Sequence, residues 1–101
     1  MVVTKKGSLL KRRDVFKTYR PRLFVLDPPL LHYYLTPQDV APRKSIFLTG
    51  CKVKEDQDGQ FLIMSSEGEA AYYLQCHDAR TRADWIEALT AAAEPTPPTP
   101  R

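Results

Sequence analysis

The period of the apolar residues changes once along this chain, near residue 78, and this change constrains the fold more than any other feature. Before it, seven short segments alternate at a spacing of two residues or carry apolar side chains on both faces, as β-strands do. The expected strands are Ser8–Arg12, Arg22–Asp27, Leu30–Leu35, Lys44–Leu48, Lys52–Glu55, Phe61–Ser65 and Ala71–Cys76. Turn-forming residues separate them, so the pattern predicts an antiparallel sandwich or barrel.

After the change, Ala79–Ala93 places Trp85, Leu89 and Ala92 at helical spacing. Asp78 is positioned to cap the first turn, and Glu94-Pro95 ends the helix. A half-closed β structure exposes part of its core. We therefore expect this single amphipathic helix to cover an open end of the sheets.

Length and composition predict one small domain, because the chain has 101 residues, of which 43% are apolar and 27% charged. We assign residues 5–94 to this domain and the Pro/Thr-rich residues 95–101 to an extended linker. The longest apolar stretches are too short to cross a bilayer and no apolar leader precedes them, so we expect a soluble, cytoplasmic domain. We also expect the isolated domain to be a monomer. Cys51 and Cys76 are expected to be buried free thiols rather than a disulfide or metal ligands.

Positive charge is concentrated at one end of the chain. Residues 5–22 hold eight basic residues and one acid, Asp14, for a net +7, whereas residues 23–101 carry a net −4. Lys11 and Arg22 share an even spacing with Leu9 and Phe24, which on strands aims all four side chains to the same side. This arrangement predicts an anion-binding pocket at the lip of a sheet rather than a general basic coating.

Several segments, taken in order, resemble the pleckstrin-homology (PH) domain. They are Gly7–Lys11, Arg20–Leu26, Leu31–Tyr34 and Arg43–Ile46, followed by Tyr73-Leu74 ahead of Ala83–Leu89. The resemblance covers residues 5–93. It implies a mainly β fold, a barrel of two near-orthogonal antiparallel sheets with seven strands, capped by one C-terminal α-helix.

The resemblance also implies a ligand and its contacts. Lys11, Arg20 and Arg22 match the motif of phosphoinositide-binding members. Tyr33 and Arg43 correspond to residues that contact inositol phosphates in members selective for 3-phosphorylated lipids such as PtdIns(3,4,5)P3. The physical need is several donors that converge from different strands, because Arg can hold one phosphate with two parallel hydrogen bonds.

A narrower likeness is to Golgi-directed PH domains of the oxysterol-binding and ceramide-transfer type, which read PtdIns4P. In those domains two apolar residues at a loop tip enter the bilayer, and Val15 and Phe16 stand at the corresponding place. We expect them to insert, with Arg12, Arg13 and Lys17 as accessory basic residues facing the headgroups. The predicted location is peripheral, on the cytosolic face of the plasma membrane or the Golgi.

Other classes of function fit the sequence less well. It has two His residues, no catalytic set at a recognisable spacing and no glycine-rich phosphate loop, so we expect no enzyme, cofactor or metal. Nucleic-acid binding is disfavoured because the remainder is acid-rich and no aromatics interleave with the basic residues. The alternative that stays open is a protein-interaction module of PH or phosphotyrosine-binding type, docking a peptide or small GTPase at its sheet edge.

Overall fold

The computed structural model describes residues 5–12, 18–56, 59–65 and 71–94. The predictions for Arg13, Val15, Phe16 and Lys17, and for the linker 95–101, fall outside this range. No helix within it is long and apolar enough to span a membrane.

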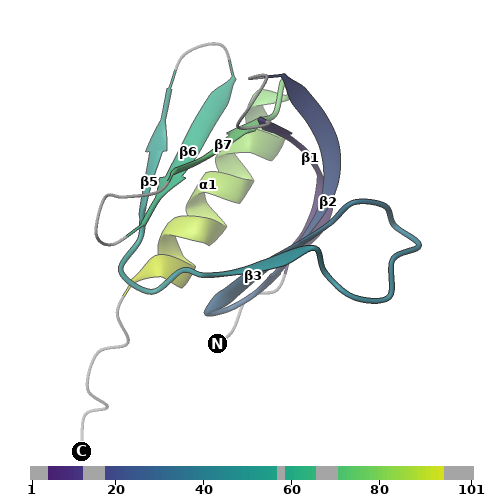
Figure 1. The fold of residues 1–101 in the computed structure, drawn as a ribbon. Coiled ribbons are helices and arrows are strands. Elements are labelled where there is room, and N and C mark those ends of the chain that lie inside the picture. The colour runs from purple at the N-terminus through teal and green to yellow at the C-terminus, as the bar shows by residue number, and fades with distance from the viewer. Residues whose placement is uncertain (1–4, 13–17, 57–58, 66–70, 95–101) are drawn as a thin grey trace, which may run out of the picture.

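The described residues form seven strands and one helix, as the sequence predicted. Figure 1 shows how these elements are arranged. They are β1 (Lys5–Arg12), β2 (Tyr19–Asp27), β3 (Leu30–Tyr34), β4 (Lys44–Phe47), β5 (Lys52–Glu55), β6 (Gln60–Met64), β7 (Ala71–Gln75) and α1 (Ala79–Ala93). The first two strands begin three residues earlier than expected, because they pair with each other from Lys5 opposite Leu26 to Arg12 opposite Tyr19. The fold class is confirmed.

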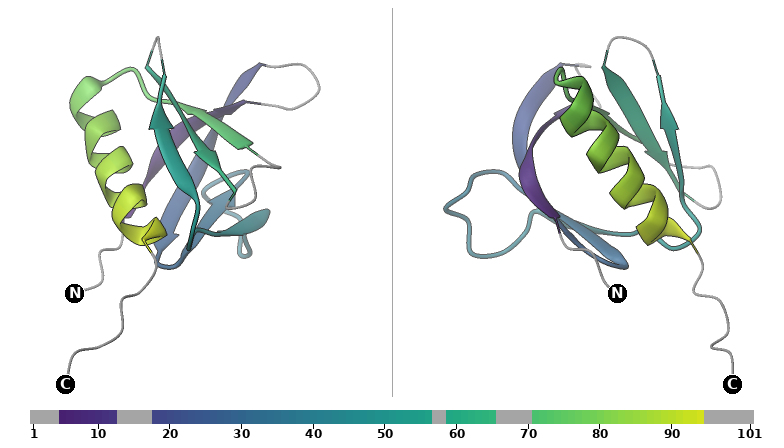
Figure 2. Two further views of the ribbon diagram at one scale, coloured as in Figure 1. Left: turned by 90° about the vertical axis from the view of Figure 1, so that its left-hand side faces the viewer. Right: turned by 180° about the vertical axis from the view of Figure 1, so that it is seen from behind.

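All strands join one antiparallel sheet in the order β4-β3-β2-β1-β7-β6-β5. The link between its two halves is short, since β1 pairs with β7 only through Leu10 and Lys11. The two expected antiparallel layers are therefore halves of one strongly curved sheet, visible from two sides in Figure 2. This curvature encloses the core and leaves β4 and β5 as the two edge strands.

The core lies between the concave side of the sheet and α1 (Figure 2). Its largest fully buried side chains are Trp85, Phe24, Phe61, Leu26, Leu31, Leu48, Ile63, Leu74 and Leu89. Trp85 and Leu89 come from the helix, so α1 covers the sheet as expected. Burial of each such side chain contributes about 1.5–3 kcal/mol.

Local interactions fix where the helix begins. Asp78 Oδ2 accepts a hydrogen bond of 2.8 Å from the Thr81 backbone N–H. This bond and a second one from the Thr81 side chain hold the pKa of Asp78 below its ordinary value. At the other end, Glu94 is the C-cap, as expected from the proline that follows it.

The two cysteines are free but only half-buried, so the expectation of buried thiols was wrong on burial. Cys51 lies directly before β5 and donates to the Phe47 carbonyl over 3.4 Å. Cys76 follows β7 and donates to the Asp78 carbonyl over 3.6 Å. Both cysteines therefore lie in connections between elements and pack against the edge of the core.

Candidate functional site: a basic pocket at one end of the barrel

At one end of the sheet, the inward-facing side chains change from apolar to polar or charged. On β1 buried Leu9 is followed at the same parity by Lys11, and on β2 buried Phe24 is preceded by Arg22. The same change occurs on β3, β4 and β7. We call the resulting end of the barrel the mouth, formed by Lys11, Arg22, Tyr33, Lys44 and Tyr72.

Four of the five predicted headgroup residues line one hollow of the mouth. Lys11, Arg22, Tyr33 and Arg43, together with Leu35, surround a cavity of about 310 Å³, which we call the basic pocket. This volume is at the lower end of the range for small-molecule sites. Three Lys and Arg side chains from three strand regions thus share one small concave surface, as the strand parity predicted for Lys11 and Arg22.

Lys11 is held in the mouth by aromatic rings. Its Nζ lies 5.1 Å from the ring centroid of Tyr33 and 6.0 Å from that of Tyr72. It also contacts the Arg12 carbonyl over 3.4 Å, at the limit of a hydrogen bond. Ring faces attract a cation without neutralising it. These contacts hold the ammonium group in the mouth, where Lys11 lines the basic pocket.

Two arginines complete the charge of the basic pocket. Arg22 Nη1 donates to the Pro21 carbonyl at 2.8 Å, which uses one of its donors and orients the guanidinium. The Arg43 N–H donates to the Tyr33 carbonyl at 2.8 Å, which ties the residue before β4 to the end of β3. Within the described part of the chain, neither arginine forms a salt bridge. Both guanidinium groups can therefore receive an anion.

Tyr33 belongs to the core and to the pocket at once. Its ring packs against Phe24 with centroids 5.6 Å apart and an interplanar angle of 37°. The same half-buried residue lines the basic pocket beneath Lys11. The geometry is compatible with a core aromatic and with a phosphate-contacting hydroxyl at once.

Arg20, the fifth predicted residue, is exposed and does not line the basic pocket. It is opposite Lys11 on β1, but β2 pairs with β3 only from Leu23 onward, so Arg20 lies beyond the three-stranded part of the sheet. Arg12 lies on the opposite face from Lys11, where its guanidinium is 3.6 Å from the ring centroid of Tyr73.

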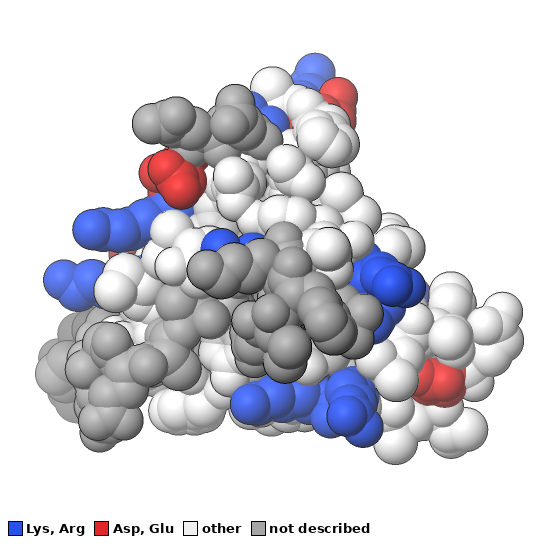
Figure 3. Space-filling model, turned by 45° about the horizontal axis from the view of Figure 1, so that its top comes forward, with Lys and Arg blue, Asp and Glu red and all other residues white. Residues whose placement is uncertain are grey.

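The described residues of the basic run do not form a single patch. Lys5 Nζ lies over the Trp85 ring at 5.4 Å, far along β1 from the mouth, and Lys6 points to the other face of the strand. Figure 3 shows Lys and Arg at several separate places on one face, with few Asp and Glu among them. Among the described residues of this run, only Lys11 and Arg22 line the basic pocket.

Sequence reasoning missed Lys44 and Tyr72. Lys44 Nζ lies 5.4 Å from the centroid of the Tyr72 ring, which Lys11 also approaches. The signal was present, because Lys44 shares the parity of buried Ile46 and Tyr72 that of buried Leu74. The parity argument made for Lys11 and Arg22 would have placed both residues at the mouth.

Comparison with known proteins identifies the family. A sequence model described as "PH domain" matches residues 3–94. The chain belongs to the PH domain family. Pleckstrin from Rattus norvegicus is 34% identical over 104 residues, covering 91% of this chain and 29% of pleckstrin. The chain thus spans less than a third of this relative, and PH domains are non-catalytic binding modules.

Solved PH domains have the same fold. The C-terminal PH domain of pleckstrin, crystallised with D-myo-Ins(1,2,3,4,5)P5, superimposes with a TM-score of 0.81 at 34% identity, covering 90% of this chain and 99% of that one. The PH domain of human oxysterol-binding protein-related protein 11 gives 0.79 at 26% identity, covering 91% and 81%. Both likenesses suggested by the sequence, to PH domains in general and to the oxysterol-binding type, are therefore found among solved structures.

Proposed function

We propose that this PH domain binds a phosphoinositide headgroup in the basic pocket and thereby recruits the protein that carries it to a membrane. One observation carries the proposal: Lys11, Arg22, Tyr33 and Arg43 line a single hollow of about 310 Å³. Two arginines and a lysine brought together repel one another, and an anion bound between them would relieve this repulsion.

Each residue has a distinct role in this proposal. Arg22 and Arg43 hold phosphates through paired hydrogen bonds, and Lys11 acts as a point charge between them. The Tyr33 hydroxyl donates a hydrogen bond to a phosphate oxygen. Arg20 and Arg12 lie outside the pocket and act on the surrounding lipid surface. Hydrogen bonds to charged groups are worth about 1.5–3 kcal/mol each, so three or four of them approach the ~8 kcal/mol of a micromolar complex.

The part of the mouth formed by Lys44 and Tyr72 favours a headgroup with more than one phosphate. Lys44 and Lys11 both approach the ring of Tyr72. Lys44 thus adds a fourth cation to the mouth, next to the three cations that line the basic pocket. The pleckstrin domain crystallised with inositol pentakisphosphate supports this choice by similarity. We therefore rank PtdIns(3,4,5)P3 ahead of PtdIns4P.

Membrane contact outside the pocket completes the proposal. Val15 and Phe16 insert into the bilayer, and Arg13 and Lys17 meet anionic headgroups beside them. The domain works as a monomer at the cytosolic face of the plasma membrane or the Golgi, and residues 95–101 link it to the rest of its host protein.

Sedimentation with liposomes tests the proposal. Vesicles that contain PtdIns(3,4,5)P3, PtdIns4P or only phosphatidylserine are compared for the wild type, Lys11→Ala and Arg22→Ala, with exposed Lys54→Ala on β5 as the matched control. We expect phosphoinositide-dependent binding that the first two changes abolish and the control keeps. Equal binding to all anionic vesicles would contradict headgroup recognition, and no binding would favour a protein partner.

Two further arms separate the headgroup from the bilayer. Soluble inositol phosphates should compete for the pocket if the headgroup alone is recognised. Phe16→Asp should weaken sedimentation without changing the affinity for a soluble inositol phosphate. Unchanged sedimentation of Phe16→Asp would remove the insertion step and leave headgroup binding in place.

A further inference from the structure

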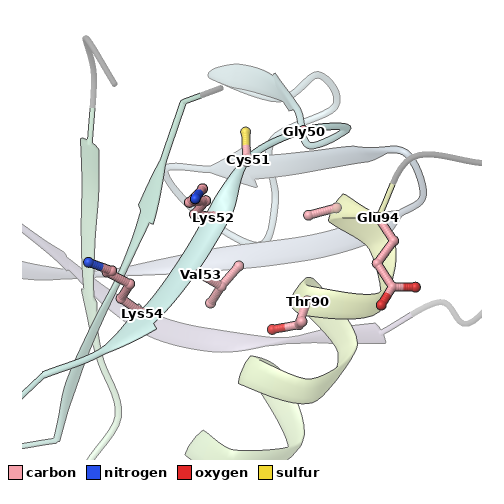
Figure 4. A pocket seen from close by; sticks show the side chains of 8 residues that line it. Gly50, Cys51, Lys52, Val53, Lys54, Thr90 and Glu94 are labelled. Atoms are coloured by element: carbon pink, nitrogen blue, oxygen red, sulfur yellow. The ribbon is translucent and has the colours of Figure 1, made fainter. Parts of the chain in front are cut away.

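A groove runs between the edge strand β5 and the C-terminal half of α1, on a different part of the barrel from the mouth. It has a volume of about 520 Å³ and is lined by Gly50, Cys51, Lys52, Val53, Lys54, Thr90, Ala93 and Glu94. In Figure 4, Val53 and Thr90 approach each other across it from the strand and the helix, whereas Lys54 points away from the helix. The groove thus has a small, mainly apolar floor and lysines on its outer rim.

The backbone of β5 presents hydrogen-bonding groups to this side. The Asp56 N–H donates to the Gln60 carbonyl at 2.8 Å, which makes this a hydrogen-bonded pair. Because such pairs alternate along an antiparallel ladder, Lys54 and Lys52 also bond to β6, while Val53 and Glu55 fall in the intervening pairs. The N–H and C=O groups of Val53 and Glu55 therefore point away from β6, toward the edge of the sheet.

Two contacts bound the groove along the strand. At one end, the Gly50 N–H donates to the Ala93 carbonyl at 2.8 Å. At the other, Arg82 Nε lies 3.4 Å from Glu55 Oε2. The four residues between them, 51–54, span roughly 13 Å at the rise of a β-strand. This length suits an added strand of about four or five residues.

The charges of β5 select the occupant. Lys52 and Lys54 are both exposed and lie on the same face of the strand. A second copy of this chain, paired antiparallel about Val53, would set each Lys52 opposite a Lys54, and like charges directly opposite are destabilising. Acidic residues at alternate positions of an added strand would instead lie beside the two lysines.

We propose that the edge of β5 and the adjoining groove bind an extended acidic segment of a partner protein, which adds a strand to the sheet. The segment alternates acidic residues, which pair with Lys52 and Lys54, with small apolar residues, which pack on Val53, Thr90 and Ala93. Its acidic positions lie near the middle of the groove, because Glu55 and Glu94 stand at the two ends.

The test uses the 101-residue chain, labelled with ¹⁵N, and two capped heptapeptides, one alternating Glu with Val and the other Lys with Val. We expect saturable shifts at Val53, Glu55 and Thr90 with the acidic peptide, and slower hydrogen exchange at the Val53 amide. The basic peptide should bind about tenfold more weakly or worse, since two attractive pairs become repulsive. The double variant Lys52→Glu/Lys54→Glu should reverse the preference without unfolding, because both side chains are exposed.

Two controls decide the location and the mode of binding. In a Lys11→Ala/Arg22→Ala background the acidic peptide should keep its affinity, and its loss would show that the peptide reads the mouth. Val53→Pro removes the outward N–H while leaving the bonds to β6, so it should weaken binding in a folded variant. If that variant does not fold, the charge reversal alone decides.

Three further results would overturn the proposal. They are equal affinity for both peptides, absence of saturable shifts at β5 and α1, and concentration-dependent dimerisation that protects the Val53 amide without peptide. The last result would assign the groove to a second copy of the chain.

Discussion

Lys11→Ala is the change that most directly separates a binding site from a structural cluster at the mouth. The ammonium group lies among two tyrosine rings and shares the basic pocket with Arg22 and Arg43. A residue placed there for binding should cost affinity when removed but little stability. A residue placed there for packing should do the opposite.

The magnitudes follow from these contacts. Removal of one charged donor to a phosphate costs about 1.5–3 kcal/mol, which corresponds to a roughly 10- to 150-fold loss of affinity. For the free protein, each lost ring contact costs about 0.5–1 kcal/mol. Relief of repulsion from Arg22 and Arg43 acts in the opposite direction. We expect the free energy of unfolding to change by less than about 1 kcal/mol. For a domain of this size, a change of about 1 kcal/mol corresponds to a shift of roughly 4–8 °C in Tm, so the observed shift should be smaller.

Calorimetric titration with a soluble inositol polyphosphate measures the affinity, and thermal unfolding without ligand measures the stability. The exposed Lys54→Ala on β5 controls for the loss of one positive charge, and both of its values should match the wild type. A fall in Tm of more than about 8 °C with unchanged affinity would refute the reasoning. Lys11 would then be a packing residue, and the pocket would need another explanation.

Three further changes test other parts of the structure. Tyr72→Leu removes the ring shared by Lys11 and Lys44 and should lower inositol polyphosphate affinity about three- to tenfold by titration, whereas Tyr72→Phe should keep it, because the ring face remains. Gly59→Ala should destabilise by about 1–3 kcal/mol in urea unfolding, because φ is +76° and the added Cβ would lie 3.0 Å from a backbone oxygen; a neutral result would contradict the strain. Hydrogen bonds from the Thr81 side chain and backbone lower the pKa of Asp78 in the folded protein below its ordinary value of 3.8. The ionised carboxylate therefore stabilises the fold fully at a pH above the pKa of the unfolded chain, and this stabilisation is lost as the pH falls through the pKa of the folded protein. Asp78→Asn should keep the cap and show a shallower loss of Tm below about pH 4, and an unchanged acid profile would exclude this contribution.

The sequence predicted the order and kind of every element, because each strand alternates or is apolar on both faces and the helix has a clear apolar stripe. It placed the starts of β1 and β2 too late, at Ser8 and Arg22. The two strands pair with each other over Lys5–Arg12 and from Tyr19 onward, which is longer than the segments with an apolar pattern. Such an extension depends on the partner strand and leaves no periodic signal in either segment alone.

The candidate site was predicted in part. Parity located Lys11 and Arg22, and the family likeness added Tyr33 and Arg43. Arg20 shares the parity of Arg22 but lies outside the basic pocket. The concave surface ends where β3 stops pairing with β2, and Arg20 lies beyond that point. The parity of residues along one strand does not show where the neighbouring strand ends.

The groove beside β5 could not be predicted from the sequence at all. Strand order alone makes β5 an edge, and that order is set by long-range pairing of β1 with β7. The packing of α1 against the same strand then determines the space between them. Neither property is encoded in the local pattern of residues 50–54.

Core and mouth use the same faces of the same strands, with Leu9 two residues from Lys11 and Phe24 two residues from Arg22. A one-residue insertion or deletion within β1 would therefore turn the leucine to solvent and the lysine out of the pocket in one step. Substitutions at the outermost inward position, by contrast, leave the buried layer beneath intact. Ligand preference in this fold can consequently diverge by single substitutions. A change in strand length, by contrast, damages the core and the pocket together.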